Sequence, residues 1–374
     1  PMLSDDGQVV LTYNGEVYNH AEIREELEKE GIKDWHSNSD TEVILAAYDH
    51  WGKRCLNHLN GMWSFVICDL QKQKIWGSCD RYGIKPMYIY NDNDYVCFSS
   101  EVKQILSLNF LKNSLDAGSI FDFLSLGSDT DSHETTMFKN IRRLRGGESF
   151  SLFYNSSKIS KPKISYWYNI ESNLYNITSS DNEIVDRFSF ILNDSVKLRL
   201  RSDVPIGAAL SGGLDSSGLV KIIDKLNKSS GTKSPLLSFS AGSNDKSLDE
   251  LDYVDELLKS VNSSNFKTVP NGTEFFDDLE KFIYHIDYPY QSTSCYASWK
   301  VYNLAKQNNV TVVFDGQGAD EILGGYYTYM YPSLFIDNIL NYNFYELYKN
   351  TVGMKSLYGF EYSNQFSSLI KKLI

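Results

Sequence analysis

The chain has 374 residues, of which 42% are hydrophobic, so it is long and apolar enough to form two ordinary cores. Its formal net charge of −12 disfavours a nucleic-acid surface, which would need a basic face, and no stretch of about 20 apolar residues predicts a membrane span. The five cysteines include no Cys-x-x-Cys pair and the six histidines show no metal-ligand spacing, which disfavours a disulfide framework and a zinc site and favours a reducing compartment.

In the N-terminal third, short apolar runs alternate with polar turns. Helical spacing predicts two helices, Ala21–Glu30 and Asp40–His50. Strands joined by tight polar turns are typical of antiparallel sheets. Five runs predict such strands, namely Val9–Tyr13, Met62–Asp69, Lys74–Cys79, Met87–Tyr90 and Tyr95–Ser99.

A polar stretch separates this region from the rest of the chain. Serine, asparagine and lysine dominate between Tyr154 and Ser180, so we expect a first domain over residues 1–165 and a second over residues 180–374. From Ile184 onward the apolar spacing is helical. Four strand-like runs then alternate with helices, which predicts a parallel α/β sheet; they are Val204–Leu210, Leu236–Ala241, Phe266–Val269 and Val310–Phe314.

Residues 211–217 read Ser-Gly-Gly-Leu-Asp-Ser-Ser, between a predicted strand and a helical stretch. The glycines let the backbone turn tightly, and the serine hydroxyls and first helical N–H groups point donors at an anion. An acid, Asp215, stands in the loop and no lysine follows, so the pattern is not a Walker A loop. Because a carboxylate facing a polyphosphate needs a divalent cation between them, the loop predicts magnesium pyrophosphate and an adenylation reaction.

This loop resembles the PP-loop of the ATP-pyrophosphatase superfamily. A second motif, Asp-Gly-Gln-Gly-Ala-Asp-Glu over residues 315–321, follows the apolar run Val310–Phe314 and precedes Gly324-Gly325-Tyr326. A loop of glycines and acids at the carboxyl end of a strand is where open α/β sheets place ligand contacts. The two motifs, about a hundred residues apart, are similar to those of the synthetase domain of glutamine-dependent asparagine synthetases.

The N-terminal third is similar to class II glutamine amidotransferase domains. Tyr-Asn-Gly-Glu-Val-Tyr-Asn over residues 13–19 and Ser-Asp-Thr-Glu over residues 39–42 resemble their glutamine-binding segments, and the segments 61–65, 80–86 and 98–101 fit the same domain. The resemblance implies an α/β two-domain fold. A partial Ntn-type αββα sandwich is followed by a Rossmann-like parallel α/β PP-loop domain.

The resemblance assigns the glutamine-binding residues. It implies an oxyanion hole formed by Asn14 and the Gly15 backbone N–H, with Glu16 and Asp40 holding the polar end of glutamine. By itself, Asn-Gly is also a strong hairpin-turn signal, so a simple turn at residues 14 and 15 is the alternative interpretation.

The resemblance also assigns an ATP and magnesium site. It implies Mg²⁺ ligation by Asp215 and Asp320, because two carboxylates converging on a polyphosphate would repel one another without the metal. The expected ATP and pyrophosphate contacts are Leu210, Ser211, Gly212, Gly213, Asp215, Ser216, Ser217, Ala241, Asp315 and Gly316.

The implied reaction is the ATP-dependent amidation of aspartate with glutamine-derived ammonia, through an acyl-adenylate that releases pyrophosphate and then AMP. Gln317 stands where some members of the family have a glutamate. A glutamine cannot take up a proton as a base but can orient ammonia or the adenylate by hydrogen bonds. The proton-transfer role at this position is therefore open.

In this family the nucleophile is a cysteine at the mature N-terminus. The chain starts at Pro1 and joins the family pattern inside the domain, so we expect the nucleophile to be absent from it and the chain as given to lack glutaminase activity. We likewise expect a C-terminal part of the synthetase domain to be missing after Ile374. An N-terminal catalytic cysteine disfavours a signal peptide, which makes the cytoplasm the expected location.

The five cysteines present do not replace that nucleophile. Cys68 and Cys97 lie in strand-like apolar runs and are expected to be buried and structural. The others are Cys55, Cys79 and Cys295.

Three functions remain open from sequence. The first is asparagine synthesis from aspartate, glutamine and ATP, with a homodimer as the expected assembly. The second is amidation of another carboxylate, such as a uronic acid of a surface polysaccharide, because the acceptor pocket is not readable from these motifs. The third is a non-catalytic module that binds nucleotide or glutamine; the pair Asp215 and Asp320 argues against it.

Overall fold

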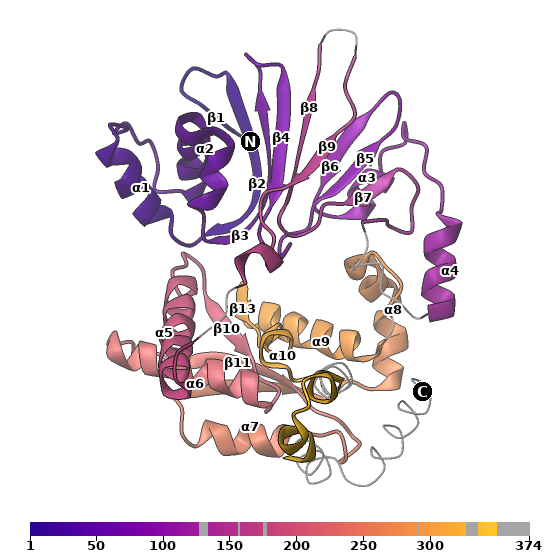
Figure 1. The fold of residues 1–374 in the computed structure, drawn as a ribbon. Helices are drawn as coiled ribbons and strands as arrows, with labels where there is room; N and C mark the ends of the chain where they lie inside the picture. Colours follow the sequence, from indigo (N-terminus) through magenta and orange to yellow (C-terminus); the bar gives the residue numbers. More distant parts are fainter. Residues whose placement is uncertain (127–133, 156–157, 175–177, 291, 327–335, 350–374) are drawn as a thin grey trace.

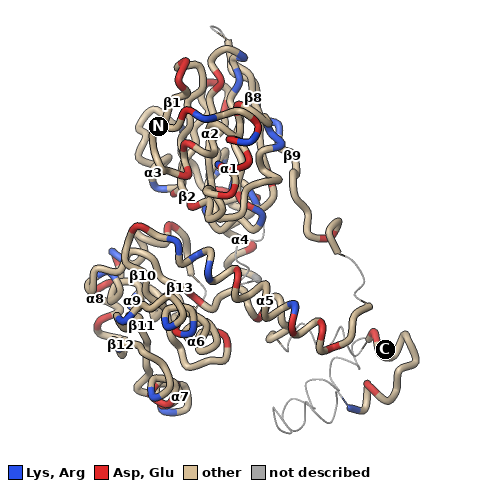
Figure 2. Tube along the Cα trace, turned by 90° about the vertical axis from the view of Figure 1, so that its left-hand side faces the viewer, with Lys and Arg blue, Asp and Glu red and all other residues tan. Residues whose placement is uncertain are grey.

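The structure is a computed structural model that describes residues 1–126, 134–155, 158–174, 178–290, 292–326 and 336–349. Two sheets built from residues 2–166 form the first half of the molecule, and a parallel sheet within residues 206–314 forms the second (Figure 1). Lysine, arginine and carboxylate residues are interspersed along both halves (Figure 2). Within the described residues, no helix combines the length and the hydrophobicity that a membrane crossing requires.

The larger N-terminal sheet is antiparallel and has the strand order β1-β2-β3-β4-β8-β9. Its centre is the long pair β2 and β3, which runs in register from Val9 opposite Asp69 to Val17 opposite Gly61. The strands are β1 (Met2–Leu3), β2 (Val9–Val17), β3 (Gly61–Asp69), β4 (Lys74–Cys79), β8 (Glu148–Phe153) and β9 (Lys163–Tyr166).

Two helices, α1 (His20–Lys29) and α2 (Asp40–Trp51), cover one face of this sheet, and the 3-10 helix η1 (Gly52–Asn57) follows α2 (Figure 1). The core beneath them joins apolar residues of α1 and α2 with Trp63, Phe65 and Trp76 of the sheet, whose exposed fractions are 1% or less. Alternation along the strands therefore sends one set of side chains to this helical layer.

A smaller sheet faces the other side. It has the order β6-β5-β7, formed by β5 (Tyr88–Asn91), β6 (Val96–Ser99) and β7 (Ile141–Arg143). Its Ile89 shares a core with Phe150 and Leu152 of the larger sheet, and the rings of Phe98 and Phe150 stack with centroids 4.7 Å apart. On the outer face, Tyr88 and Tyr90 pack against α3 (Val102–Leu106). The layers are helix, sheet, sheet and helix, as predicted, and α4 (Ala117–Leu126) follows α3.

The second half contains a four-stranded parallel sheet of order β12-β11-β10-β13. The strands are β10 (Ile206–Ala209), β11 (Leu236–Ala241), β12 (Ser263–Thr268) and β13 (Val312–Phe314). Ala208 and Leu210 pack with α5, α6 and α7 on one face, while Ala209 contacts the α9 side on the other. A sheet covered on both faces is typical of parallel α/β folds, so the predicted fold class is confirmed.

The helices of the second half begin with α5, which carries a capping box formed by Ser180 and Glu183. The helices are α5 (Asp181–Arg199), α6 (Leu214–Ser229), α7 (Leu251–Leu258), α8 (Gly272–Ile286), α9 (Ser294–Gln307) and α10 (Ala319–Leu323), and the 3-10 helix η3 (Glu171–Asn173) precedes them.

Within the described residues, ion pairs join the two halves at two places. Arg201, just after α5, binds both carboxylate oxygens of Glu22 at 2.8 and 2.6 Å and also donates to the Tyr18 carbonyl oxygen at 3.0 Å. Lys103 binds Asp287, at the end of α8, with a nitrogen–oxygen distance of 3.2 Å. The first contact links Tyr18, directly after β2, and α1 to the segment that leads into β10.

Candidate active site

A cavity of about 560 Å³ lies at the carboxyl end of the parallel sheet, between the two motif loops. Strands β10 and β13 are parallel neighbours, with Ala208 opposite Phe314, so the loops that follow them emerge side by side. Ten predicted residues line the cavity: Leu210, Ser211, Gly213, Asp215, Ser216, Ala241, Asp315, Gly316, Gln317 and Asp320. Gly212 and Ser217 were also predicted as contacts and are not among the residues that line it.

The first motif forms a tight turn into α6. Gly212 has φ +93°, and a Cβ there would lie 2.8 Å from the Glu250 carbonyl oxygen, so the position requires glycine. Ser211 Oγ and Ser216 Oγ are 3.0 Å apart and bond each other across the turn. Gly213 caps α6, whose first turn leaves backbone N–H groups without helical partners. This arrangement can bind an anion.

The second motif packs directly against the first. A Cβ on Gly316 would lie 3.0 Å from the Ser216 backbone nitrogen and 3.3 Å from Asp215 Cβ. Glycine at this position therefore lets the two loops approach closely at the start of α6. Farther along, a Cβ on Gly325 would collide with the Asp320 carboxylate, so Gly325 makes room for that side chain.

The carboxylates of Asp215 and Asp320 line the same cavity from different loops. Neither takes part in a hydrogen bond or ion pair with another side chain of the described residues. Those residues also contain no cluster of three or more metal-ligating side chains. Mg²⁺ is usually held by one or two carboxylates together with substrate phosphates, so the pair fits this ion.

The third wall of the cavity lies outside the motifs that predicted the site. It comes from α9 and consists of Ser294, Ala297, Ser298, Val301 and Tyr302, and Leu248 and Glu250 contribute before α7. The signal was present in the sequence, because small residues at positions 294, 297 and 298 recur at helical spacing. Small side chains on one helix face leave room for a ligand.

The predicted glutamine-binding residues lie in the other half. Asn14 and Gly15 are inside β2, opposite Ser64 and Trp63, so the alternative that they form a hairpin turn is wrong. A Cβ on Gly15 would lie 2.2 Å from the Met62 carbonyl oxygen. The glycine is thus required by the close approach of β3. The Asn14 amide is exposed and donates to Ser100 Oγ at 3.2 Å.

Asp40 opens α2 and ties that helix to β2. Its Oδ2 accepts hydrogen bonds from the Tyr13 hydroxyl at 2.7 Å and the Val17 backbone N–H at 2.9 Å. Burial and the Asp40 charge raise the pKa of Tyr13, so its hydroxyl stays a donor. Asp40 has this structural role, and its contact with glutamine stays a prediction.

Glu16 faces carboxylates from both halves of the molecule. Burial raises the pKa of Glu16, and the charges of Asp40 and Asp203 raise it further, against an opposing effect of Lys85. Glu16 therefore keeps its proton to a higher pH than an ordinary glutamate. Asp203 lies in the segment between α5 and β10, so the electrostatics of the predicted glutamine site depend on the second half of the chain.

The positions of the five cysteines do not suit a nucleophile for glutamine hydrolysis. Cys55 and Cys79 are fully buried, and burial raises the pKa of the Cys55 thiol to about 12. Cys68 and Cys97 lie in strands β3 and β6 as expected but are only half-buried. Cys295 is exposed on α9, in the other half of the molecule.

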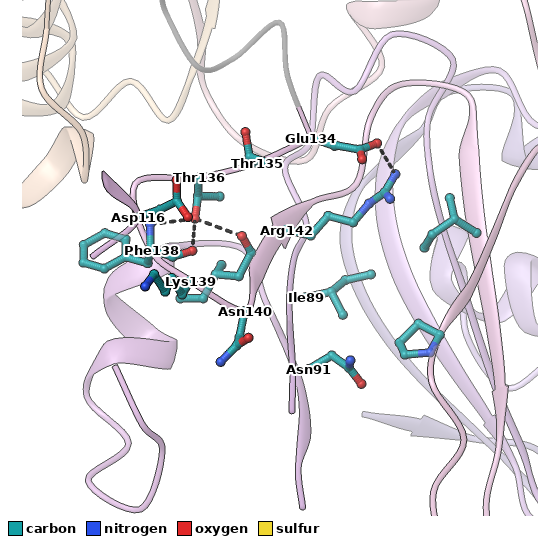
Figure 3. A pocket seen from close by; sticks show the side chains of 13 residues that line it. Ile89, Asn91, Asp116, Glu134, Thr135, Thr136, Phe138, Lys139, Asn140 and Arg142 are labelled. Atoms are coloured by element: carbon teal, nitrogen blue, oxygen red, sulfur yellow. Dashed lines mark hydrogen bonds and ion pairs between the residues drawn. The ribbon is translucent and has the colours of Figure 1, made fainter. Parts of the chain in front are cut away.

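A second cavity, of about 330 Å³, lies beside the smaller sheet of the N-terminal half (Figure 3). Its Arg142 turns toward Glu134 and also binds the buried Glu148 at 2.9 Å. The Thr136 hydroxyl bonds the carbonyl oxygens of Phe138 and Ile141. These contacts hold the segment around β7 together, and we assign the cavity no ligand.

Comparison with protein families matches both halves. Residues 1–167 match the glutamine amidotransferase domain, and residues 188–366 match the asparagine synthase domain. The first match contains the two antiparallel sheets, and the second contains the parallel sheet.

Individual relatives carry the same two functions in their names. The chain is 33% identical to a putative glutamine-hydrolysing asparagine synthetase 2 of Methanocaldococcus jannaschii, over 87% of the chain and 60% of that protein. It is 31% identical to glutamine-hydrolysing asparagine synthetase 1 of Bacillus subtilis, over 89% of the chain and 50% of the relative. The chain thus spans about half the length of the relatives it matches.

Among solved structures, glutamine phosphoribosylpyrophosphate amidotransferase from B. subtilis, complexed with ADP and GMP, aligns with 72% of the chain and 63% of its own. The sequence identity is 14% and the TM-score 0.31, too low to support an inference.

Proposed function

Since the chain belongs to the family of glutamine-dependent asparagine synthetases, we propose that it is the part of such an enzyme that activates a carboxylate with ATP for amidation. The observation that supports this most is the cavity in which both motif loops meet, with Asp215 and Asp320 on its wall. The proposed substrates are aspartate, ATP and glutamine. Residues 1–165 form the proposed glutamine-using domain and residues 180–374 the ATP-using domain.

The turn at residues 211–217 binds the pyrophosphate part of ATP in this proposal. The donors are the Ser211 and Ser216 hydroxyls, which line the cavity, and the first N–H groups of α6. Asp215 and Asp320 would hold Mg²⁺, which offsets the phosphate charge when it is bound. Leu210, Ala241 and Gly316 line the same cavity and contact the rest of the nucleotide in this proposal.

The chemistry is the attack of the aspartate side-chain carboxylate on the α-phosphorus of ATP. A phosphorus–oxygen bond forms, the bond to pyrophosphate breaks, and β-aspartyl-AMP results. Ammonia then attacks the activated carbonyl carbon, AMP leaves with the bonding electrons, and a proton is lost from nitrogen. Activation is needed because a free carboxylate is a poor acyl donor. Asn14 and the Gly15 N–H stabilise the oxyanion during glutamine hydrolysis, which supplies the ammonia.

Gln317 orients the reacting groups by hydrogen bonds in this proposal. Its side chain is exposed on the loop between Gly316 and Gly318, at the cavity wall. Because an amide does not take up a proton, a base is not required at this position. We therefore expect Gln317→Glu to keep AMP formation within about tenfold of the wild type. Loss of all AMP formation would show that the amide itself is needed.

The test of the proposed function is the release of AMP and pyrophosphate from Mg-ATP by the full-length gene product. Aspartate is compared with a panel of other carboxylates in the presence of ammonium. Release that requires aspartate, with asparagine as product, supports the proposal. Release with another acid alone moves the protein to the class that amidates a different carboxylate, and no release with any acid favours a binding module.

A further inference from the structure

A tyrosine and a carboxylate are paired at one end of the cavity. Tyr302, on α9, donates its hydroxyl hydrogen to Asp315 Oδ2 at 2.6 Å. Asp315 is the first residue after β13, and both side chains line the cavity with Asp215 and Asp320. The motifs that predicted the other site residues do not include Tyr302.

Asp315 connects Tyr302 to the loop that carries Gln317. While Oδ2 accepts from Tyr302, Oδ1 accepts the Gln317 backbone N–H at 3.2 Å. A carboxylate that bonds the N–H two residues later forms an Asx turn, which sets the local backbone conformation. The residue after Gln317 is Gly318, whose φ of +95° lies in the left-handed region that favours glycine. The loop therefore turns tightly at this point.

We propose that Tyr302 is a positioning residue, which fixes the Asp315 carboxylate so that the loop presents Gln317 to the activated substrate. This inference rests on the proposed function, because it assigns Tyr302 to the same adenylation site. The action is indirect. The hydroxyl bonds the carboxylate, and the carboxylate bonds the backbone of the residue that faces the reacting groups.

The contribution of Tyr302 lies mainly in its hydroxyl. Tyr302 as a residue is 44% exposed, so its ring is not enclosed in the core. Burial of the hydroxyl and its bond to Asp315 raise the pKa of Tyr302, which keeps the phenol a donor and not a base. Removing only the hydroxyl should therefore release Asp315 without unfolding α9.

The same helix offers a matched control. Tyr296 donates to Asp278 Oδ2 at 2.7 Å, so it makes the same kind of bond with nearly the same length. Tyr296 is 4% exposed and lies outside the cavity, among aromatic rings of α8 and α9 that include Phe275 and Phe282. This pair therefore serves as an example of a tyrosine–aspartate hydrogen bond that has a structural role only.

The experiment compares Tyr302→Phe with Tyr296→Phe in the full-length gene product. For Tyr302→Phe we expect kcat for AMP formation to fall about tenfold, as for loss of a hydrogen bond to a charged group. The KM for ATP and the Kd for a non-hydrolysable ATP analogue should stay within about twofold, since the phosphate donors lie on the other loop. Tyr296→Phe should instead lower the melting temperature and leave kcat within about twofold.

Two further readouts separate positioning from a general loss of structure. Amide hydrogen exchange of a peptide that spans residues 315–318 should be faster in Tyr302→Phe and unchanged in Tyr296→Phe, with no substrate present. In Asp315→Ala, which removes the acceptor of the Tyr302 hydroxyl, the additional change Tyr302→Phe should lower kcat by less than about twofold, because the two residues act through the same hydrogen bond. The pH profile of kcat should keep its shape in Tyr302→Phe.

Three results would overturn this role. If the wild type is active and Tyr302→Phe has the same kcat, Tyr302 is not a positioning residue. A weaker Kd for the ATP analogue at an unchanged kcat would make Tyr302 a nucleotide contact instead. A wild type that forms no AMP with any carboxylate would overturn the proposed function itself and this role with it.

Discussion

Asp215→Ala is expected to lower AMP and pyrophosphate formation by at least about a thousandfold while the fold remains intact. Asp215 lines the cavity with Asp320, and no side chain of the described residues bonds its carboxylate, so its removal leaves no internal partner unsatisfied. The loss arises because the proposed Mg²⁺ site is left with one carboxylate opposite the phosphates. Product release from Mg-ATP and the melting temperature are measured on the same preparation.

The matched control for this variant is Asp252→Ala. Asp252 is the second residue of α7, as Asp215 is of α6, so both carboxylates lie in the first turn of a helix and interact with its dipole in the same way. Asp252 lies outside the cavity, and its replacement should leave turnover within about twofold. Comparable losses in both variants would show that the helix start, and not metal binding, is what Asp215 supports.

The second large effect is expected on stability. Asp80→Ala should lower the free energy of unfolding of the N-terminal half by at least about 3 kcal/mol. Asp80 is fully buried, and its carboxylate accepts backbone N–H bonds from Trp63, Tyr82, Ile84 and Lys85 at 3.0–3.1 Å. Alanine leaves all four donors without their acceptor.

Denaturant unfolding followed by tryptophan fluorescence measures this change. Five of the six tryptophans belong to the N-terminal half, namely Trp35, Trp51, Trp63, Trp76 and Trp167. Asp245→Ala is the control: its exposed carboxylate accepts from the Ser247 N–H and hydroxyl, and its loss should cost less than about 1 kcal/mol. Equal changes in the two variants would mean that water replaces the buried carboxylate of Asp80.

Asp80 also affects the predicted glutamine site. It holds the backbone of Trp63, which pairs with Gly15 across β2 and β3. The motif that contains Asp80 was found by resemblance. That the Asp80 carboxylate accepts the backbone N–H bonds of the turn that follows it is visible only in the structure. Loss of stability in Asp80→Ala should therefore be accompanied by loss of glutamine hydrolysis in the full-length gene product.

The sequence by itself predicted most strands of both halves and the turn at residues 211–217, but not the strands β1, β7, β8 and β9. Short apolar runs between polar turns predicted β3 and β4 almost to their ends, and helical spacing predicted α1 and α2. These signals are local, because a side-chain period of 2 or 3.6 residues can be recognised within a few neighbouring positions of the chain. The turn at residues 211–217 was equally readable, since tight turns and helix starts use few residue types.

Only the tertiary structure decided what depends on residues far apart in the chain. The Asn14-Gly15 pair signals a turn locally, yet it lies within β2 because β3 approaches too closely for any Cβ at Gly15. The pairing of Tyr302 with Asp315 was likewise invisible, since it depends on how α9 packs against the sheet beside β13. Local periodicity fixes which way a side chain points along its own element, but only the packing of elements fixes what it meets.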